Sequence, residues 1–142
     1  MSEADMQAAD APESGEAKPL TPYDLIGGAE AVRRLADRFY DIMDEEHAAA
    51  GIRHMHAQDL GQIKERLFEF LSGWLGGPQD YFQRADRPCI RSAHRPYAIG
   101  EGERDQWLMC MRRAMVETEV PEAVHKLLDQ AFFRMADMLR SR

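Results

Sequence analysis

Cysteine is scarce in this sequence, and long apolar runs are missing. Only Cys89 and Cys110 occur among 142 residues, and they form no CxxC pattern, which excludes a disulfide framework and a zinc ribbon. No apolar run approaches the roughly 18 residues that a membrane-spanning helix needs. The N-terminus also lacks the basic start and the apolar stretch of a signal peptide. We therefore expect a cytoplasmic protein with no membrane partner.

Positively charged residues are also scarce relative to acidic ones. Lysine and arginine total 18 against 25 acidic residues, for a net charge of -7. Nucleic-acid binding is excluded on this ground, because phosphate contacts require a positive field. Much of the negative charge lies in residues 1–20, which contain five acidic side chains, one lysine and no periodic apolar positions. We expect this segment to be a disordered leader and residues 21–142 to form one domain.

Strand patterns are missing too, whereas helical periodicity recurs along the chain. No segment alternates apolar and polar residues with the β-branched enrichment of a strand. Apolar residues three and four positions apart instead predict amphipathic helices, with starts at Thr21, Asp59 and Pro121 and stops at glycine pairs. The expected helices cover about 21–27, 29–46, 60–75, a short segment bracketed by Pro88 and Pro96, a stretch from about 103, and 121 to near the C-terminus. The predicted fold class is all-α, a compact packing of helices.

The five histidines are the candidate metal ligands. His125 is expected at the surface of the last helix, and His47, His54 and His56 lie in a polar segment that we expect to be a loop. As zinc ligands these three lack a clear fourth partner and regular spacing. His94 lies two residues before a proline that tends to end its short helix. From spacing alone, His94 is equally well a structural histidine.

Several motifs in a fixed order resemble the truncated haemoglobins. They are Gly27-Gly28, Arg38-Phe39-Tyr40, Asp59-Leu60, Glu65-Arg66-Leu67, Phe70-Leu71 and Gly76-Gly77-Pro78. Two downstream runs resemble group II of that family, Ile90-Arg91-Ser92-Ala93-His94-Arg95-Pro96-Tyr97 and Glu103-Arg104-Asp105-Gln106-Trp107-Leu108-Met109-Cys110-Met111. The resemblance covers about residues 21–140 and implies a two-over-two helical sandwich around haem b (iron protoporphyrin IX).

The resemblance assigns His94 as the proximal iron ligand and Tyr40 and Trp107 as hydrogen-bond donors on the opposite, distal face. Ile63 and Leu67 would form the distal wall. The residue types suit this chemistry, because a diatomic ligand on ferrous iron accepts hydrogen bonds and the phenol and indole each offer a donor. Donors in a water-poor pocket interact more strongly with developing negative charge than donors in water. We therefore expect oxygen to be released slowly.

His56 departs from the group II pattern, which usually has tyrosine or phenylalanine after the first long helix. The usual Tyr-Pro pair is also replaced, by His56-Ala57. We expect His56 to act in the distal pocket as a hydrogen-bond donor, in proton transfer or as a sixth iron ligand. One alternative is that it packs against the porphyrin and bonds Tyr40. Another is a shift of one residue, which would place Met55 there instead.

The same resemblance predicts further contacts with haem. The permanently charged guanidinium of Arg66 suits a haem propionate, and the alternative is a solvated charge. Tyr81 and Arg91 are further candidates for the propionates. Ile63 can restrict ligand access only by its bulk, because its side chain has no hydrogen-bonding group. The remaining expected contacts with the macrocycle are Phe70, Tyr97 and Met111.

Two classes of function agree with these residues. One is a protein that binds or transports O2, or senses it together with NO or CO, at a five-coordinate ferrous iron. The other is an enzyme, a nitric oxide dioxygenase or a peroxidase-like catalyst acting on peroxide, in which Tyr40, His56 and Trp107 assist proton transfer. No flavin or nicotinamide motif is present, so turnover would need an external reductase. A haem-free helical interaction module is a third hypothesis, and we expect a monomer or homodimer.

Overall fold

The computed structural model of the protein describes residues 20–85 and 89–142. These residues form helices and no strand, which confirms the all-α prediction. The helices are α1 (Pro22–Ile26), α2 (Gly28–Glu45), η1 (His47–Ala49), α3 (Ala50–Arg53), α4 (Gly61–Trp74), α5 (Asp80–Gln83), α6 (Ile90–His94), α7 (Glu101–Glu117) and α8 (Glu122–Met138). None of the described helices is long and apolar enough to cross a membrane. The predicted leader, except for its last residue, lies outside the described residues.

The first helix begins and ends as its residue types predict. The Thr21 hydroxyl oxygen accepts a hydrogen bond from the Asp24 amide at 3.1 Å, and the Asp24 carboxylate accepts the Thr21 amide at 3.2 Å, which is a capping box. Gly27 then adopts a φ of +121°, which glycine tolerates because it has no Cβ. Gly28 follows with a φ of +78°, and α2 begins at this residue.

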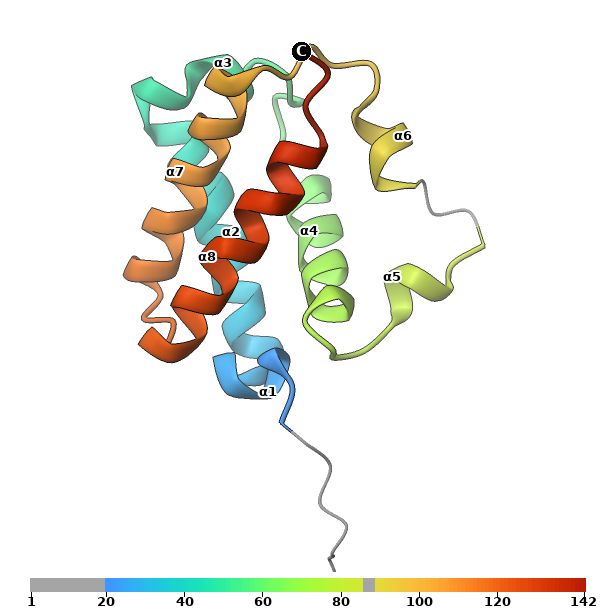
Figure 1. The fold of residues 1–142 in the computed structure, drawn as a ribbon, viewed down its shortest axis with the longest axis vertical. Coiled ribbons are helices and arrows are strands. Elements are labelled where there is room, and N and C mark those ends of the chain that lie inside the picture. Colours follow the sequence, from blue (N-terminus) through green and yellow to red (C-terminus); the bar gives the residue numbers. More distant parts are fainter. Residues whose placement is uncertain (1–19, 86–88) are drawn as a thin grey trace, which may run out of the picture.

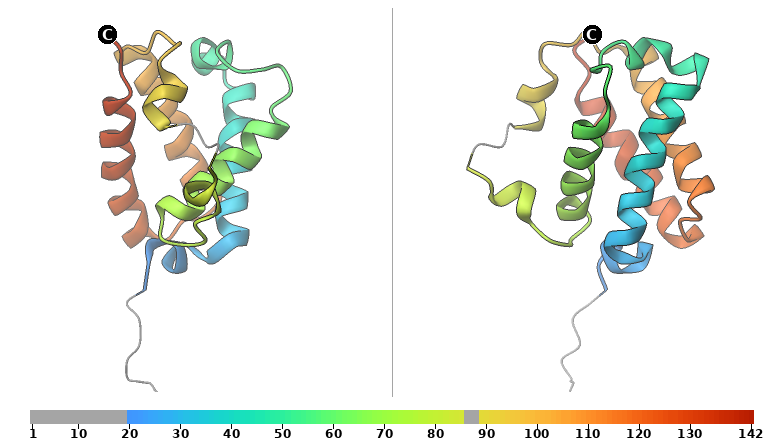
Figure 2. Two further views of the ribbon diagram at one scale, coloured as in Figure 1. Left: turned by 90° about the vertical axis from the view of Figure 1, so that its right-hand side faces the viewer. Right: turned by 180° about the vertical axis from the view of Figure 1, so that it is seen from behind.

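The core is built around α2, whose buried side chains share one face. They are Ala31, Val32, Leu35, Ala36, Phe39, Tyr40, Ile42 and Met43. Helix α2 packs against α4 and α7, and α7 packs against α8. Figures 1 and 2 show these four long helices as the body of the fold, with the short elements arranged around them. This arrangement confirms the predicted two-over-two sandwich.

The segment after α2 differs from the expected polar loop. It forms the 3-10 turn η1 and the short helix α3 before it continues to α4. Ala49 is fully buried and Ile52 is 5% exposed, so two apolar side chains attach these turns to the core. The Glu46 carboxylate also accepts the Ala48 amide at 3.5 Å at the start of η1. Sequence reasoning missed the turns because each is too short to show a helical period.

The start of α4 also differs from the prediction. The sequence predicts Asp59 as the N-cap, whereas the residue that precedes the helix is Leu60. The Asp59 carboxylate still accepts the Gly61 amide at 2.8 Å, so it satisfies one donor that the helix start leaves open. The helix ends at Trp74, shortly before the predicted glycine pair.

A limb that carries α5 and α6 connects α4 to α7. Figure 1 shows both short helices to one side of the long helices. Tyr81 of α5 is buried, whereas α6 contains no buried residue. Sequence reasoning predicted α6 between two prolines but missed α5, which spans only four residues. Pro88, one of those prolines, lies outside the described residues.

Candidate functional site

Aromatic rings from four helices meet inside the fold. The Phe39 ring of α2 lies 5.2 Å from the Trp107 ring of α7, and Trp107 lies 5.6 Å from Phe132 of α8, measured between centroids. Phe132 stacks on Trp74 of α4 at 5.1 Å. Tyr40 joins the cluster through Phe39, with centroids 4.8 Å apart. The fold therefore places Tyr40 and Trp107, the two predicted donors, in one aromatic cluster.

Tyr40 and Trp107 each hold a polar hydrogen without an acceptor. Tyr40 is only 5% exposed. Over residues 20–85 and 89–142, neither its hydroxyl nor the Trp107 indole N–H makes a hydrogen bond. Burial raises the pKa of Tyr40, so the phenol keeps its proton. Tyr40 is buried and Trp107 is half-buried. Because a buried donor without an acceptor costs free energy, both groups suit a ligand that accepts hydrogen bonds.

His56 lies beside Tyr40, with the ring centroids 5.5 Å apart. Its Nδ1 donates a hydrogen bond to the Ile52 carbonyl at 2.8 Å. Burial is the main cause that lowers the pKa of His56 from its ordinary 6.5, so the ring is neutral at pH 7. The single N–H of a neutral imidazole is then already in use, and Nε2 carries a lone pair. His56 therefore offers the site an acceptor or base, and not a donor.

His94 ends α6 and is held in the same way. Its Nδ1 donates to the Ile90 carbonyl at 2.7 Å, so Nε2 is the ring atom that remains for a metal. His56 and His94, from separate segments of the chain, therefore each keep Nε2 free of hydrogen bonds to the described residues.

Large apolar side chains on α4 and α8 are incompletely covered. On α4, Ile63, Leu67 and Phe70 pack against the core but stay half-buried. On α8, Leu127 is 52% and Met138 is 43% exposed. Sequence reasoning did not assign the α8 residues to the site, although a spacing of three and four places one set on the same side of the helix: Leu127, Ala131, Met135 and Met138. Apolar surface of this kind is available to a ligand or to another protein.

Comparison with known protein families identifies the family of this chain. A sequence model of the bacterial-like globin family matches residues 21–141. The chain belongs to the bacterial-like globins. This globin is also 32% identical, over 94 residues, to the group 2 truncated hemoglobin of Bacillus subtilis; the match covers 66% of the globin and 68% of that relative.

Solved structures agree with the family. A cold-adapted truncated hemoglobin from Pseudoalteromonas haloplanktis TAC125 is 35% identical, with a TM-score of 0.82 over 87% of this globin and 99% of that chain. The group II 2-on-2 hemoglobin of Agrobacterium tumefaciens is 36% identical, with a TM-score of 0.82 over 88% of this globin and 97% of that chain. These matches confirm the group II truncated assignment and the two-on-two fold.

The family implies haem binding and small diatomic ligands, and the residues of this globin fit that group. His94 offers a lone pair on Nε2, which is the usual axial ligand atom in globins. Tyr40 and Trp107 offer donors that have no acceptor among the described residues. The half-buried apolar side chains of Ile63, Leu67 and Phe70 on α4 suit contact with a flat, largely apolar macrocycle.

The other predicted haem contacts lie in different environments. Arg66 and Arg91 are exposed, and neither guanidinium has an ion-pair partner within the described part of the chain. Tyr81 is 9% exposed on α5, and Tyr97 is 40% exposed in the turn after α6. Met111 is fully buried in the core. Their contacts with haem stay predictions.

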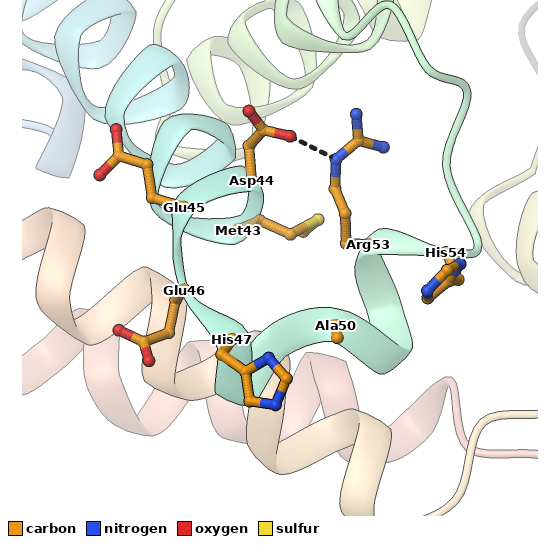
Figure 3. Close-up of a pocket in the computed structure, with 8 residues that line it drawn as sticks. All are labelled: Met43, Asp44, Glu45, Glu46, His47, Ala50, Arg53 and His54. Carbon is orange, nitrogen blue, oxygen red and sulfur yellow. Dashed lines mark hydrogen bonds and ion pairs between the residues drawn. The ribbon is translucent and has the colours of Figure 1, made fainter.

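The remaining histidines near α3 belong to a different surface. Figure 3 shows a hollow at the end of α2 that is lined by Met43, Asp44, Glu45, Glu46, His47, Ala50, Arg53 and His54. Asp44 and Arg53 turn toward each other there and form an ion pair at 2.8 Å. No group of three side chains able to hold a metal ion occurs among the residues that the structure describes. Charged or polar side chains line most of this hollow, in contrast to the aromatic cluster.

Proposed function

We propose that this globin binds haem b through His94 and holds a diatomic ligand, O2, NO or CO, at a five-coordinate ferrous iron. One observation carries the proposal. Tyr40 and Trp107 belong to the same aromatic cluster, and both donors lack partners among the described residues. A diatomic ligand with partial negative charge is the acceptor that both donors need. Donors fixed in a dry pocket hold such a ligand strongly, so oxygen leaves slowly.

Ferrous haem supplies the metal that binds the diatomic molecule, and the chain orients and surrounds it. The Ile90 carbonyl holds the Nδ1–H of His94, which makes Nε2 the ligand atom and increases its basicity. Ile63 and Leu67 form an apolar wall on α4, which limits the access of water. Tyr40 and Trp107 then act in an environment where each hydrogen bond is stronger than in water.

The edges of the haem are held by residues outside the aromatic cluster. Arg66 on α4 and Arg91 on α6 supply positive charges for the propionates, and Tyr81 supplies a hydroxyl. Arg66 and Arg91 are exposed, as charges that meet propionates at a solvent-facing edge should be. Further contacts with the macrocycle come from Phe70, Tyr97 and Met111.

Haem titration of the purified full-length chain tests the iron ligand. We expect uptake of haem with a Soret band in the wild type, and loss of the proximal bond in His94→Ala. His125→Ala is the matched control, because His125 is a half-buried histidine on α8 and makes none of the aromatic contacts of the cluster. A normal Soret band with unchanged axial ligation in His94→Ala would overturn the proposal.

Tyr40→Phe tests the distal donors. The substitution removes one hydroxyl and keeps the ring that contacts Phe39. Loss of a hydrogen bond worth about 1 to 1.5 kcal/mol predicts roughly tenfold faster dissociation of O2. Stopped-flow measurement on the ferrous protein gives this rate. An unchanged rate would remove Tyr40 from the ligand network.

A second candidate function is catalysis, as a nitric oxide dioxygenase or a peroxidase-like enzyme. The observation that favours it is the neutral His56 beside Tyr40, because an imidazole can accept and return a proton near neutral pH. Conversion of nitric oxide and O2 to nitrate consumes an electron in each turnover, and so an external reductase is required. Continuous nitrate formation in the presence of an added reductase favours the enzyme, whereas a single turnover favours ligand binding.

A further inference from the structure

His56 and His94 are each held by a hydrogen bond of the same kind. Each Nδ1 donates to the carbonyl of the isoleucine four residues earlier, Ile52 at 2.8 Å and Ile90 at 2.7 Å. A carbonyl partner on Nδ1 is the usual support of a histidine that binds a metal through Nε2. We propose that His56 is a second iron ligand, which binds through Nε2 opposite His94 when the protein is oxidised and holds no external ligand. This proposal rests on the proposed function, because it requires haem held by His94.

The position of His56 separates it from its neighbours in sequence. Its ring contacts Tyr40, with centroids 5.5 Å apart, and so lies next to the aromatic cluster. His47 and His54 are exposed and line the charged hollow of Figure 3. Of the three histidines near α3, His56 is therefore the one that lies beside a predicted distal donor.

Gln106 of α7 anchors the peptide that holds His56. Its Oε1 accepts the Ile52 amide at 3.0 Å, while the carbonyl of Ile52 accepts Nδ1–H of His56. Gly51 permits this approach, since a Cβ at that position would lie 3.0 Å from Gln106 Oε1. The next residue of α7 is Trp107, so one helix positions both the imidazole and the indole. Gln106 is thus a positioning residue for His56.

Arg53 fixes the chain on the other side of His56. Its guanidinium donates to the carbonyls of Ala57 and Gln58 at 2.9 and 2.8 Å and pairs with Asp44 at 2.8 Å. The turn is therefore tied to the end of α2, and the Asp44 bond is visible in Figure 3. Because the fold itself restricts the turn, little conformational freedom is left to lose when the imidazole binds iron.

Tyr40 is the rival ligand and is less suited to the role. A tyrosine coordinates iron best as a phenolate, and burial raises the pKa of Tyr40, which opposes loss of its proton. A neutral imidazole needs no proton loss. Within the described residues, Nε2 of His56 makes no hydrogen bond, to the Tyr40 hydroxyl or to any other group. The Nε2 lone pair of His56 is therefore available to coordinate iron, because no described residue competes for it.

Electron paramagnetic resonance and visible spectra of the ferric holoprotein, with no added ligand, test the proposal. The wild type is expected to show six-coordinate, low-spin iron, and His56→Phe is expected to convert it to high spin. His54→Phe is the matched control, because His54 is an exposed histidine on the same segment, and it should keep the low-spin signal. High-spin iron in the wild type, or a low-spin signal that survives His56→Phe, overturns the second ligand.

The same samples separate this proposal from the proposed function. Failure to take up haem contradicts both. Haem uptake that depends on His94, together with high-spin ferric iron, leaves the proposed function intact and overturns only the role of His56. The reduced protein gives a further check, since a six-coordinate ferrous spectrum contradicts the five-coordinate iron of the proposed function and leaves the ferric assignment to His56 standing.

The anchoring role of Gln106 has its own test. Gln106→Leu removes the oxygen that accepts the Ile52 amide, whereas Gln106→Glu keeps an oxygen in place. We expect the low-spin fraction of the ferric iron to fall in Gln106→Leu and to be retained in Gln106→Glu. Equal low-spin fractions in both variants and the wild type would show that the Ile52 peptide holds His56 without help from α7.

Discussion

His56 and His94 lie on two segments that the fold supports differently. We call the segment of α3 and the turn after it the distal arm, and α6 the proximal arm. His56 follows α3, where Ile52 is 5% exposed and its amide is bound to α7. His94 belongs to α6, which contains no buried residue, and residues 90–94 form no ion pair within the described part of the chain. The same imidazole–carbonyl bond therefore has a buried support in one arm and a half-buried or exposed one in the other.

This difference indicates which side of the site is held in place by the protein chain alone. The distal arm is attached to the core by packing and by bonds to α2 and α7. Elements with few buried contacts open at a low cost in free energy, and α6 is such an element. A ligand that binds only the folded form stabilises it by mass action. If His94 binds haem as proposed, α6 should gain much of its stability from that bond.

Matched truncations of the two supporting isoleucines should give the largest effect. Ile52→Ala removes a buried side chain and is expected to cost about 2 to 4 kcal/mol of unfolding free energy. Ile90 is only half-buried, so Ile90→Ala is expected to cost less than about 1 kcal/mol. Urea unfolding of the haem-free protein measures both. Equal losses would show that the two arms have equally strong supports.

Cysteine alkylation should show a smaller contrast between the limb and the core. Cys89 is exposed directly before α6, whereas Cys110 is buried on α7. Burial raises the pKa of Cys110 to about 11, and the thiolate is the reactive form. At a pH of about 8, we expect iodoacetamide to modify Cys89 at least about tenfold faster than Cys110.

Mass spectrometry of the modified peptides measures this ratio. The difference should narrow as the pH rises toward the pKa of Cys110, because its thiolate fraction then increases. If both thiols react at one rate in the folded protein, the α7 core opens as readily as the limb, and the contrast between the two arms fails.

The smallest effect is expected at an ion pair that lies outside both arms. Arg33 and Glu65 join α2 to α4 at 2.6 Å. Both side chains are well exposed, so solvent screening limits the cost of Glu65→Gln to below about 0.5 kcal/mol. The hydrogen bond from Arg33 lowers the pKa of Glu65 from its ordinary 4.5.

The sign of the pH dependence follows from that lowered pKa. The pair stabilises the fold at pH values above 4.5, and this contribution is lost as the pH falls through the lower pKa of the folded state. Unfolding free energies of the wild type and Glu65→Gln should therefore converge at acid pH. A difference that persists there would point to a role in packing, and a changed haem spectrum would connect the pair to the site.

Much of the fold could be predicted because its signals are local. The apolar period of α2, the Thr21 cap and the proline before α8 each act within one or a few turns of helix. The turns η1 and α3 could not be predicted, since their stability comes from burying Ala49 and Ile52 against distant helices. The exposed side of α8 shows a clear period, but the period alone does not tell which side meets a ligand.

The candidate site was predictable to a similar extent. Family resemblance indicated Tyr40, Trp107 and His94, and the fold places the first two in one cluster. The resemblance also indicated His56 as the unusual residue. It did not indicate that His56 uses its N–H on Ile52, because that bond depends on the α3 turn that the sequence pattern does not show.

By itself, the sequence determined the all-helical class, the order of the long helices and the residue types available for binding a metal and a diatomic ligand. Caps and apolar periods suffice for this because they act between near neighbours. Only the tertiary structure decided that His56, and not His47 or His54, lies against Tyr40 with an uncommitted lone pair. Its anchor joins Ile52 to Gln106, 54 positions apart, and a contact at that separation exists only once α3 packs on α7.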